Sequence, residues 1–271
     1  MPRSYADRAV ALATLSAVLD RNRPLEEAFD EAAGSKAGGD KLSARDRGFA
    51  RLIASTALKR LGQTDALIAH CLEKPLPPSA QPVRHALRLG VTQLLFLDVP
   101  AHAAIDSAVS LLAKTRHAGF KGLANAVLRR LDREGKTLLD AQDAAWLNMP
   151  DWLWHALVGA YGEVTARAIA AANLTEPPLD ISAKADAALW AERLEGALLP
   201  TGTIRRGFGG AIADLPGYEE GAWWVQDAAA ALPALLLGEV AGKDVIDLCA
   251  APGGKTAQLA HAGAAVTALE L

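Results

Sequence analysis

The stretch Asp-Val-Ile-Asp-Leu-Cys-Ala-Ala-Pro-Gly-Gly-Lys-Thr, residues 244–256, decides the fold of the last part of the chain. Val245, Ile246 and Leu248 form a short apolar run that is typical of a strand buried on both faces. Small residues and two glycines follow, which let the backbone turn sharply and let a ligand approach it closely. A helical pattern then runs over residues 256–262. This order predicts a nucleotide-type site, because unpaired N–H groups point out of the start of a helix.

A second β-like run, residues 266–269, ends in Glu270. An acidic residue at the tip of the second strand, roughly 20 residues past the turn, is placed to bind ribose hydroxyls. A phosphate-binding loop would need a glycine at position 249, where the sequence has Cys249. The dinucleotide pattern Gly-x-Gly-x-x-Gly is absent as well. What remains is a ribose-binding α/β site without a pyrophosphate cradle, and S-adenosylmethionine, which carries no phosphate, fits that description.

The ten residues Asp-Leu-Cys-Ala-Ala-Pro-Gly-Gly-Lys-Thr, 247–256, resemble the first motif of the RNA 5-methylcytosine methyltransferases. Val-Gln-Asp, residues 225–227, resembles the segment that precedes this motif in the family. Within the family the bacterial RsmB/Sun (Fmu) type, which methylates ribosomal RNA, is the best match because the N-terminal part also agrees. The resemblance implies that S-adenosylmethionine is the cofactor.

The same resemblance implies which residues hold the cofactor. They are Cys249, Ala250, Ala251, Pro252, Gly253, Gly254, Lys255 and Glu270. The turn would wrap the methionine and ribose parts, and Glu270 would accept hydrogen bonds from both ribose hydroxyls. The family more often has Asp there, but Glu is one methylene longer and is expected to reach. Two roles stay open: Asp247 orients the turn, caps it or meets the cofactor's amino group, and Lys255 neutralises a carboxylate or is solvated.

No catalytic residue is predicted within the sequence. Cys249 lies at a strand end, which places it against the cofactor rather than against a base. By resemblance, the family's two working cysteines lie in later motifs, where one attacks carbon-6 of cytosine and the other assists release. Neither motif occurs before Leu271. We therefore expect a chain cut off early in its catalytic domain and unable to methylate RNA by itself.

Composition limits the classes of protein. The 271 residues allow one large or two modest domains, and 51% hydrophobic with 22% charged residues excludes global disorder. Cys71 and Cys249 give neither a zinc spacing nor a disulfide framework, which indicates a reducing, cytoplasmic setting. The six histidines show no metal-binding spacing. No apolar run approaches the roughly 20 residues of a membrane span, and the N-terminus lacks the apolar core of a signal peptide.

Charge is unevenly distributed along the chain. Residues 1–136 hold 21 Lys+Arg and 14 Asp+Glu, a net +7, whereas residues 137–271 hold 7 and 17, a net −10. A basic half beside an acidic half favours RNA binding by the basic half, although a solvated helical surface would explain the same excess. The candidate RNA contacts are Arg45, Arg47, Arg51, Arg129 and Arg130.

Residues 1–136 predict an all-α bundle of about seven helices joined by short links. Ser4 and Ser43 are placed to cap two of them, and residues 34–40 read as a loop. Helices are expected over residues 4–20, 82–97 and 120–131, and four more are expected to start at residues 24, 43, 65 and 100. This region is similar to the NusB-like RNA-binding domain that heads the RsmB family.

Residues 137–225 predict a helical and α+β linking module. A helix is expected to start at Asp151, and β-like runs fall at 179–181, 203–205, 211–213 and 223–225, with a helix at 186–194. The family usually has Arg-Val-Asn after Pro-Pro-Leu, whereas this chain has Asp-Ile-Ser at 180–182, so no RNA contact is carried over there. Trp223 and Trp224 are expected in the core rather than stacked on bases. Asp227 is the expected N-cap of the next helix.

We thus expect three parts: a NusB-like domain over 1–136, the linking module over 137–225, and the start of a Rossmann-like methyltransferase domain over 226–271. The implied function is methylation of cytosine carbon-5 in small-subunit ribosomal RNA by a cytoplasmic monomer. The rival hypothesis is an RNA-binding module of NusB type, acting in transcription antitermination and hence in regulation of transcription, with an inert methyltransferase remnant.

Overall fold

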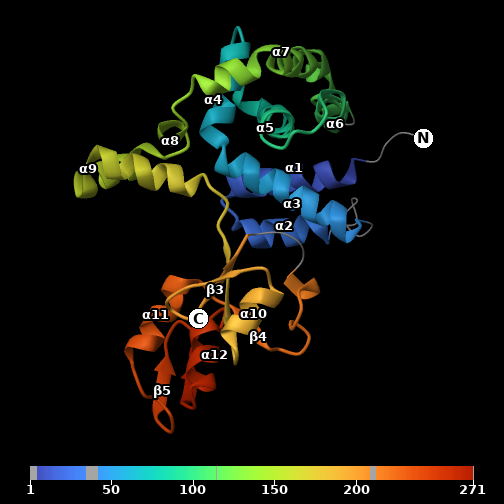
Figure 1. Cartoon of the computed structure of the whole chain (residues 1–271). Coiled ribbons are helices and arrows are strands. Elements are labelled where there is room, and N and C mark those ends of the chain that lie inside the picture. Colours follow the sequence, from blue (N-terminus) through green and yellow to red (C-terminus); the bar gives the residue numbers. More distant parts are fainter. Residues whose placement is uncertain (1–4, 35–41, 114, 208–211, 271) are drawn as a thin grey trace. The chain divides into compact units, whose positions relative to one another are not determined.

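The computed structural model describes residues 5–34, 42–113, 115–207 and 212–270 (Figure 1). Ser4 and most of the loop expected at 34–40 lie outside these residues. The chain forms two compact units, residues 1–174 and residues 175–271. The expected three-part division stays a prediction, and the helix that crosses residue 136 continues to Asp140. No helix in the described ranges combines the length and the apolarity that a bilayer span requires.

The first unit is helical, as predicted. Its main helices are α1 (Ala6–Arg21), α2 (Leu25–Ala33), α3 (Ala44–Lys59), α4 (Leu61–Cys71), α5 (Gln81–Leu95), α6 (Ala101–Ala113) and α7 (Lys121–Asp140), with the 3₁₀ turns η2 (Pro78–Ala80) and η3 (Ala118–Phe120). The predicted cap of α3 is confirmed: the Ser43 hydroxyl accepts a hydrogen bond from Asp46 N at 3.1 Å. Such a cap satisfies an amide that the helix itself cannot pair.

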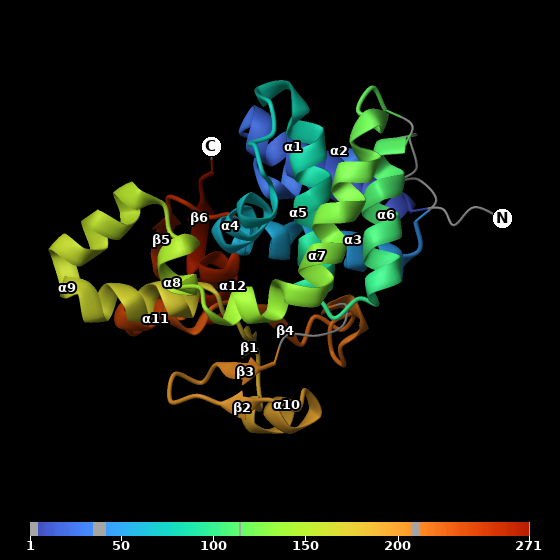
Figure 2. The ribbon, with the colours of Figure 1, turned by 90° about the horizontal axis from the view of Figure 1, so that it is seen from above.

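Helix α5 is the centre of this unit. It packs against α1, α3, α4, α6 and α7, and in the view from above it lies between α1 and α7 (Figure 2). Leu87 on one side joins Leu128 and Leu131 of α7, and Leu89 on the other side joins Leu15 of α1. These leucines are buried, and each contributes about 1.5–3 kcal/mol by leaving water.

The unit ends in the short helix α8 (Ala144–Leu147) and in α9 (Asp151–Asn173), which is kinked at Gly162, where φ is +76°. Asp143 caps α8 by accepting from Trp146 N at 3.1 Å. The end of α8 docks on the start of α4 because Asn148 accepts from Gln63 N at 3.1 Å and donates to Gln63 Oε1 at 2.8 Å.

The second unit begins with a small α+β module. It contains β1 (Leu179–Ala183), α10 (Ala187–Arg193), β2 (Ala197–Leu198), β3 (Ile204–Arg206), the 3₁₀ turn η4 (Ile212–Asp214) and β4 (Trp223–Val225). The strands form an antiparallel sheet in the order β2-β3-β1-β4, with Ile181 opposite both Ile204 and Val225. Trp223 lies in its core, as predicted, and donates its indole N–H to Pro216 O at 2.8 Å.

One expectation about this module was wrong, and one strand was not predicted. No strand forms over residues 212–213, which belong to η4; residue 211 lies outside the described residues. Isolated small residues such as Ala213 carry too little β preference to hold a strand without a partner. The two-residue strand β2 was not predicted, because its sequence, Ala197–Leu198, has no strand signal of its own. Pairing with β3 alone defines it.

The rest of the second unit is α11 (Ala228–Leu236), β5 (Asp244–Asp247), α12 (Gly254–His261) and β6 (Ala265–Ala268). Strands β5 and β6 are parallel, with Val245 opposite Val266, and both side chains pack with Leu259 of α12. The prediction that the first strand is buried on both faces was wrong for the described residues. Ile246 is 63% exposed and Leu248 is 71% exposed, because the helices cover the opposite face of this two-stranded sheet.

Candidate functional site

The predicted turn lies at the carboxyl end of β5. Parallel pairing continues past the strands, since Leu269 N donates to Asp247 O at 2.8 Å and Ala250 N donates to Leu269 O at 3.1 Å. Gly253 N then reaches back to Ala250 O at 2.6 Å. Gly253 itself has φ +103°, a left-handed conformation that residues with a side chain rarely adopt. The glycine at this position therefore allows the chain to enter α12 at once.

The start of α12 exposes amides to the turn. Ala257 N donates to Gly253 O at 2.8 Å, and this is the first bond of the helical pattern. The amides of Gly254, Lys255 and Thr256 precede it, so the helix gives them no acceptor. Together with the helix dipole they form a place that favours a negatively charged group.

Asp247 ties the strand to this helix. It is 8% exposed, and its Oδ2 accepts a hydrogen bond from the Thr256 hydroxyl at 2.7 Å. Of the alternatives that the sequence left open, orientation of the turn is the role that this geometry supports. The turn is thus held at its start by the strand ladder and at its end by this side chain.

Glu270 lies over the same turn. Its Oε2 accepts from Ala251 N at 2.8 Å, so the carboxylate is drawn toward the loop although the residue is exposed. A carboxylate oxygen accepts two hydrogen bonds, which leaves Oε1 and a second position on Oε2 for a ligand. Cys249 is exposed and Lys255 half-buried. The residues predicted from the cofactor motif therefore meet at one edge of the β5–β6 sheet.

Two glutamines beside the site had no role in the sequence-based prediction. Gln226 follows β4 and is 5% exposed, and its amide contacts Gln258 of α12 at 2.8 Å. Gln226 stands in the Val-Gln-Asp motif, and that motif was the one signal for it. Nothing in the sequence indicated Gln258. The neighbouring prediction for Asp227 is confirmed, since its Oδ1 accepts from Ala229 N at 2.8 Å and so caps α11.

The first group of predicted RNA-binding arginines lies on α3. Arg47 pairs with Asp30 of α2 at 2.7 Å, and Arg51 makes a two-bond ion pair with Glu26 of α2. Hydrogen bonding from Arg51 lowers the pKa of the Glu26 carboxyl. Arg45, on the first turn of α3, is exposed. Two of these three predicted contacts thus already have carboxylate partners within the helical unit.

The second group lies on α7. Arg129 donates to Asn125 Oδ1 at 3.3 Å, and Arg130 pairs with Glu134 at 3.0 Å. Arg130 also lines a groove of about 680 Å³ with the apolar side chains of Phe120 and Leu123. The five arginines therefore lie on two different helices, and their contact with RNA stays a prediction.

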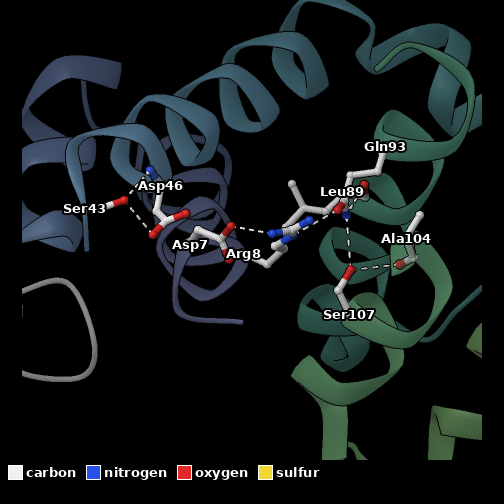
Figure 3. Close-up of polar contacts among 8 residues, drawn as sticks. All are labelled: Asp7, Arg8, Ser43, Asp46, Leu89, Gln93, Ala104 and Ser107. Atoms are coloured by element: carbon white, nitrogen blue, oxygen red, sulfur yellow. Dashed lines mark hydrogen bonds and ion pairs between the residues drawn. The ribbon is translucent and has the colours of Figure 1, made fainter. Parts of the chain in front are cut away.

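Arg8, on the first turn of α1, is used internally. Arg8 forms an ion pair with Asp7 and donates to Gln93 Oε1 at 3.1 Å (Figure 3). Its guanidinium carbon also lies 4.7 Å from the centre of the Phe49 ring. Gln93 in turn donates to Leu89 O at 3.0 Å. This network joins α1 to α5 inside the unit, so Arg8 contributes little to the surface charge.

A metal centre has no candidate in the residues described, where no three His, Cys, Asp or Glu side chains gather closely enough to hold an ion. Cys71 lines the α7 groove, and burial raises the pKa of its thiol. A raised thiol pKa disfavours the thiolate that nucleophilic or metal-binding cysteines require.

The two units together indicate the class of protein to which the chain is similar. Residues 6–133 match the model of the NusB family, which covers the helices α1 to α7 up to residue 133. A NusB-like all-α domain is therefore followed by a mixed α/β unit that carries a glycine-rich turn at the end of a parallel strand.

Comparison with curated proteins confirms the family resemblance. The chain is 36% identical to "Ribosomal RNA small subunit methyltransferase B" of Pseudomonas putida, over 97% of this chain and 61% of that protein. The protein of the same name from Pasteurella multocida is 33% identical, over 93% of this chain and 57% of its own length. The chain therefore spans about three fifths of the length of these relatives, 61% of the first and 57% of the second.

A solved structure supports the fold. The crystal structure of PH0851 superimposes with a TM-score of 0.66 and covers 99% of this chain and 64% of that one. Sequence identity is 19%, so this likeness concerns the architecture alone. The two chains therefore share this architecture over nearly the whole of the present chain.

Proposed function

We propose that this chain binds S-adenosylmethionine at the β5–α12 turn and serves the methylation of cytosine carbon-5 in small-subunit ribosomal RNA. One observation carries the proposal: the unpaired amides at the start of α12 lie at the same sheet edge as the Glu270 carboxylate. An α/β site with those two features suits a ligand that has both a carboxylate and a ribose. The names of the relatives support ribosomal RNA as the substrate.

The residues present fit this cofactor rather than a nucleotide phosphate. A phosphate-binding loop needs several backbone amides in a glycine-rich cradle, and position 249 holds Cys249 instead of the required glycine. The three amides of Gly254, Lys255 and Thr256 suffice for the single carboxylate of a methionine. Lys255 adds a positive charge in the first turn. Rossmann-like folding of the complete cofactor domain belongs to the same proposal.

Glu270 has acceptor capacity left for ribose. One lone pair of Oε2 is taken by Ala251 N, and hydroxyl donors can reach Oε1 and the second lone pair of Oε2. The same bond fixes the carboxylate before the ligand arrives, which lowers the entropic cost of binding. When bound, S-adenosylmethionine supplies an electrophilic methyl group on sulfur. The first-turn amides of α12 and the Glu270 carboxylate bind and orient it.

The helical unit is proposed to hold the RNA. Its sequence carries the basic excess of the chain, and its match to the NusB family supports an RNA-binding role. Arg45 and Arg129 are the two predicted contacts that have no carboxylate bond among the described interactions. Binding that depends on such contacts weakens steeply as salt is added, because each neutralised phosphate releases counterions.

The test is calorimetric titration of the chain with S-adenosylmethionine, with ATP as the phosphate-bearing control ligand. We expect binding of S-adenosylmethionine and not of ATP. Glu270→Ala is expected to weaken it about 10- to 100-fold, since hydrogen bonds to a charged group contribute about 1.5–3 kcal/mol. Glu270→Gln keeps an oxygen for Ala251 N but loses the charge, so it separates loss of ribose binding from loosening of the turn.

Glu220→Ala is the matched control, because Glu220 is an exposed carboxylate in a turn of the same unit. Its affinity should equal that of the unmodified chain. Absence of binding by the unmodified chain, or equal binding by Glu270→Ala, would contradict the proposed site. The rival hypothesis of an RNA-binding module, which the NusB match also favours, predicts salt-dependent RNA binding without any cofactor binding.

A further inference from the structure

We propose that Gln226 is a positioning residue that fixes the first turn of α12 against the four-stranded sheet, and so sets where the amides of the cofactor site point. The role is mechanical and acts through Gln258 and Gly254. The identity of the ligand rests on the proposed function; the positioning of the helix by Gln226 does not.

The Gln226 amide is bonded from three directions. Its Oε1 accepts from the Ser182 hydroxyl of β1 and from the Trp224 indole N–H of β4, both at 2.9 Å. Its Nε2 donates to Gln258 Oε1 of α12 at 2.8 Å. A primary amide can accept two bonds on one atom and donate from the other, which a hydroxyl, carboxylate or ammonium group in this place does not do. Glutamine is therefore a suitable residue for a position that forms hydrogen bonds to a sheet and to a helix at once.

Close packing adds to these bonds at the very start of the helix. A Cβ placed on Gly254 would lie 3.3 Å from Gln226 Cγ and 3.6 Å from its Cβ. The first residue of α12 therefore rests on the stem of Gln226, while the amide head holds Gln258, one turn further along. Because Gly254 and Gln258 are four residues apart, they share one face of the helix.

The same face of α12 is also connected to α11 and, at its last turn, to the module. Gln258 donates from Nε2 to Ala231 O of α11 at 3.1 Å, and His261 Nε2 lies 2.6 Å from Lys184 O. On another side, Thr256 and Leu259 attach α12 to its own strands through Asp247 and Val245. The helix is therefore held between two sheets, and Gln226 is the module's contact with its first turn.

Loss of the amide would leave buried groups without partners. Gln226 is 5% exposed, so water does not readily replace it as acceptor for Trp224 or as donor to Gln258. The first turn of α12 would then keep its strand-side contacts and the packing of Gly254 on the side-chain stem, but it would lose the support of the Gln226–Gln258 bond one turn further along. We infer that its amides would spread over more orientations, and a ligand carboxylate would bind them less tightly.

The experiment is a double-mutant cycle with Gln226→Leu, Gln258→Leu and the double variant, in the full chain. Each single variant is expected to weaken S-adenosylmethionine binding about tenfold, the loss of one to two net hydrogen bonds. If Gln226 acts through Gln258, the double variant binds about as well as either single variant, since coupled residues are not additive. Ile181→Val is the control: it reduces packing in the module core and should leave affinity unchanged.

Amide hydrogen exchange without ligand gives a second readout. Gln226→Leu should speed exchange in the peptide covering residues 254–261 and leave the strands of the module unchanged. Should Gln226→Leu fail to fold, Gln258→Leu removes the same bond from the other side. If the unmodified chain binds the cofactor, and Gln226→Leu shows unaltered affinity and unaltered amide exchange, the positioning role is overturned and the proposed function is not. Altered exchange in a chain that binds no cofactor supports the positioning role and contradicts the proposed function.

Discussion

Gly62 in α4 is the position where a single methyl group has the largest predicted effect on the helical unit. A Cβ there would lie 1.6 Å from Leu147 O and 2.4 Å from Leu147 C, whereas ordinary contact starts at 3.4 Å. Both atoms belong to the backbone of α8, so no side chain can rotate away. Gly62→Ala must displace the end of α8 from α4 by well over an ångström.

The cost can be estimated from the bonds at this junction. The displacement breaks the bond from Gln63 N to Asn148 Oδ1, the bond from Asn148 to Gln63 Oε1, and the bond from Gln142 Nε2 to Gln63 O. Three bonds at about 1 kcal/mol each give about 3 kcal/mol, and alanine returns about 1 kcal/mol as a better helix former. The net loss is about 2 kcal/mol, or a melting temperature lower by about 4–8 °C for a unit of this size.

Thermal unfolding followed by circular dichroism at the helical minimum would measure this shift. Gly48→Ala is the matched control, because Gly48 is also a helical glycine, is exposed on α3, and has open space where the Cβ would stand. It should raise the melting temperature, since replacing glycine by alanine in a helix gains about 0.5–1 kcal/mol. A Gly62→Ala protein that is as stable as Gly48→Ala would refute the docking of α8 on α4.

Three further predictions concern titratable and charged side chains of the same unit. Burial lowers the pKa of His85, so folding keeps this imidazole neutral while the unfolded chain takes up a proton below about pH 6.5. Stability should therefore fall as pH drops below that value, and urea unfolding of His85→Gln should show a flatter decline. Asp65→Asn leaves Arg88, which is 7% exposed, without its carboxylate and should cost about 3 kcal/mol in the same assay. Glu26→Gln, at the exposed Arg51 pair, should change the free energy of unfolding by less than about 1 kcal/mol.

Local signals explain which parts of the fold could be predicted. The helix starts at Ser43 and Asp227 were predicted because a cap acts within three residues of itself, and both caps are present. Strand β2 was missed because it exists only through pairing with β3, at a distance that a single sequence does not reveal. The exposure of Ile246 was missed for the same reason, because the sequence does not show whether a neighbouring element covers an apolar residue.

The same distinction between local and long-range signals applies to the candidate site. Its turn is encoded in consecutive residues, and Glu270 reaches that turn through its bond to Ala251 N, while cofactor binding there stays a prediction. The attachment of that turn to the rest of the unit is not consecutive. Gln226 and Gln258 stand 32 positions apart, and neither residue type marks a junction by itself. A motif thus identifies the atoms that meet a ligand, whereas the side chains that hold those atoms in place need the structure.

A net charge does not show which side chains carry it. The net +7 of residues 1–136 already subtracts every carboxylate, and the structure shows which arginines are paired with one. Arg88 is buried and bound to the half-buried Asp65, and Arg47 and Arg51 face the carboxylates of α2. A paired arginine presents a dipole to an approaching phosphate, and its field falls off faster than that of a free charge. The strength of RNA binding should therefore follow the number of unpaired cations on the helical unit rather than its total of basic residues.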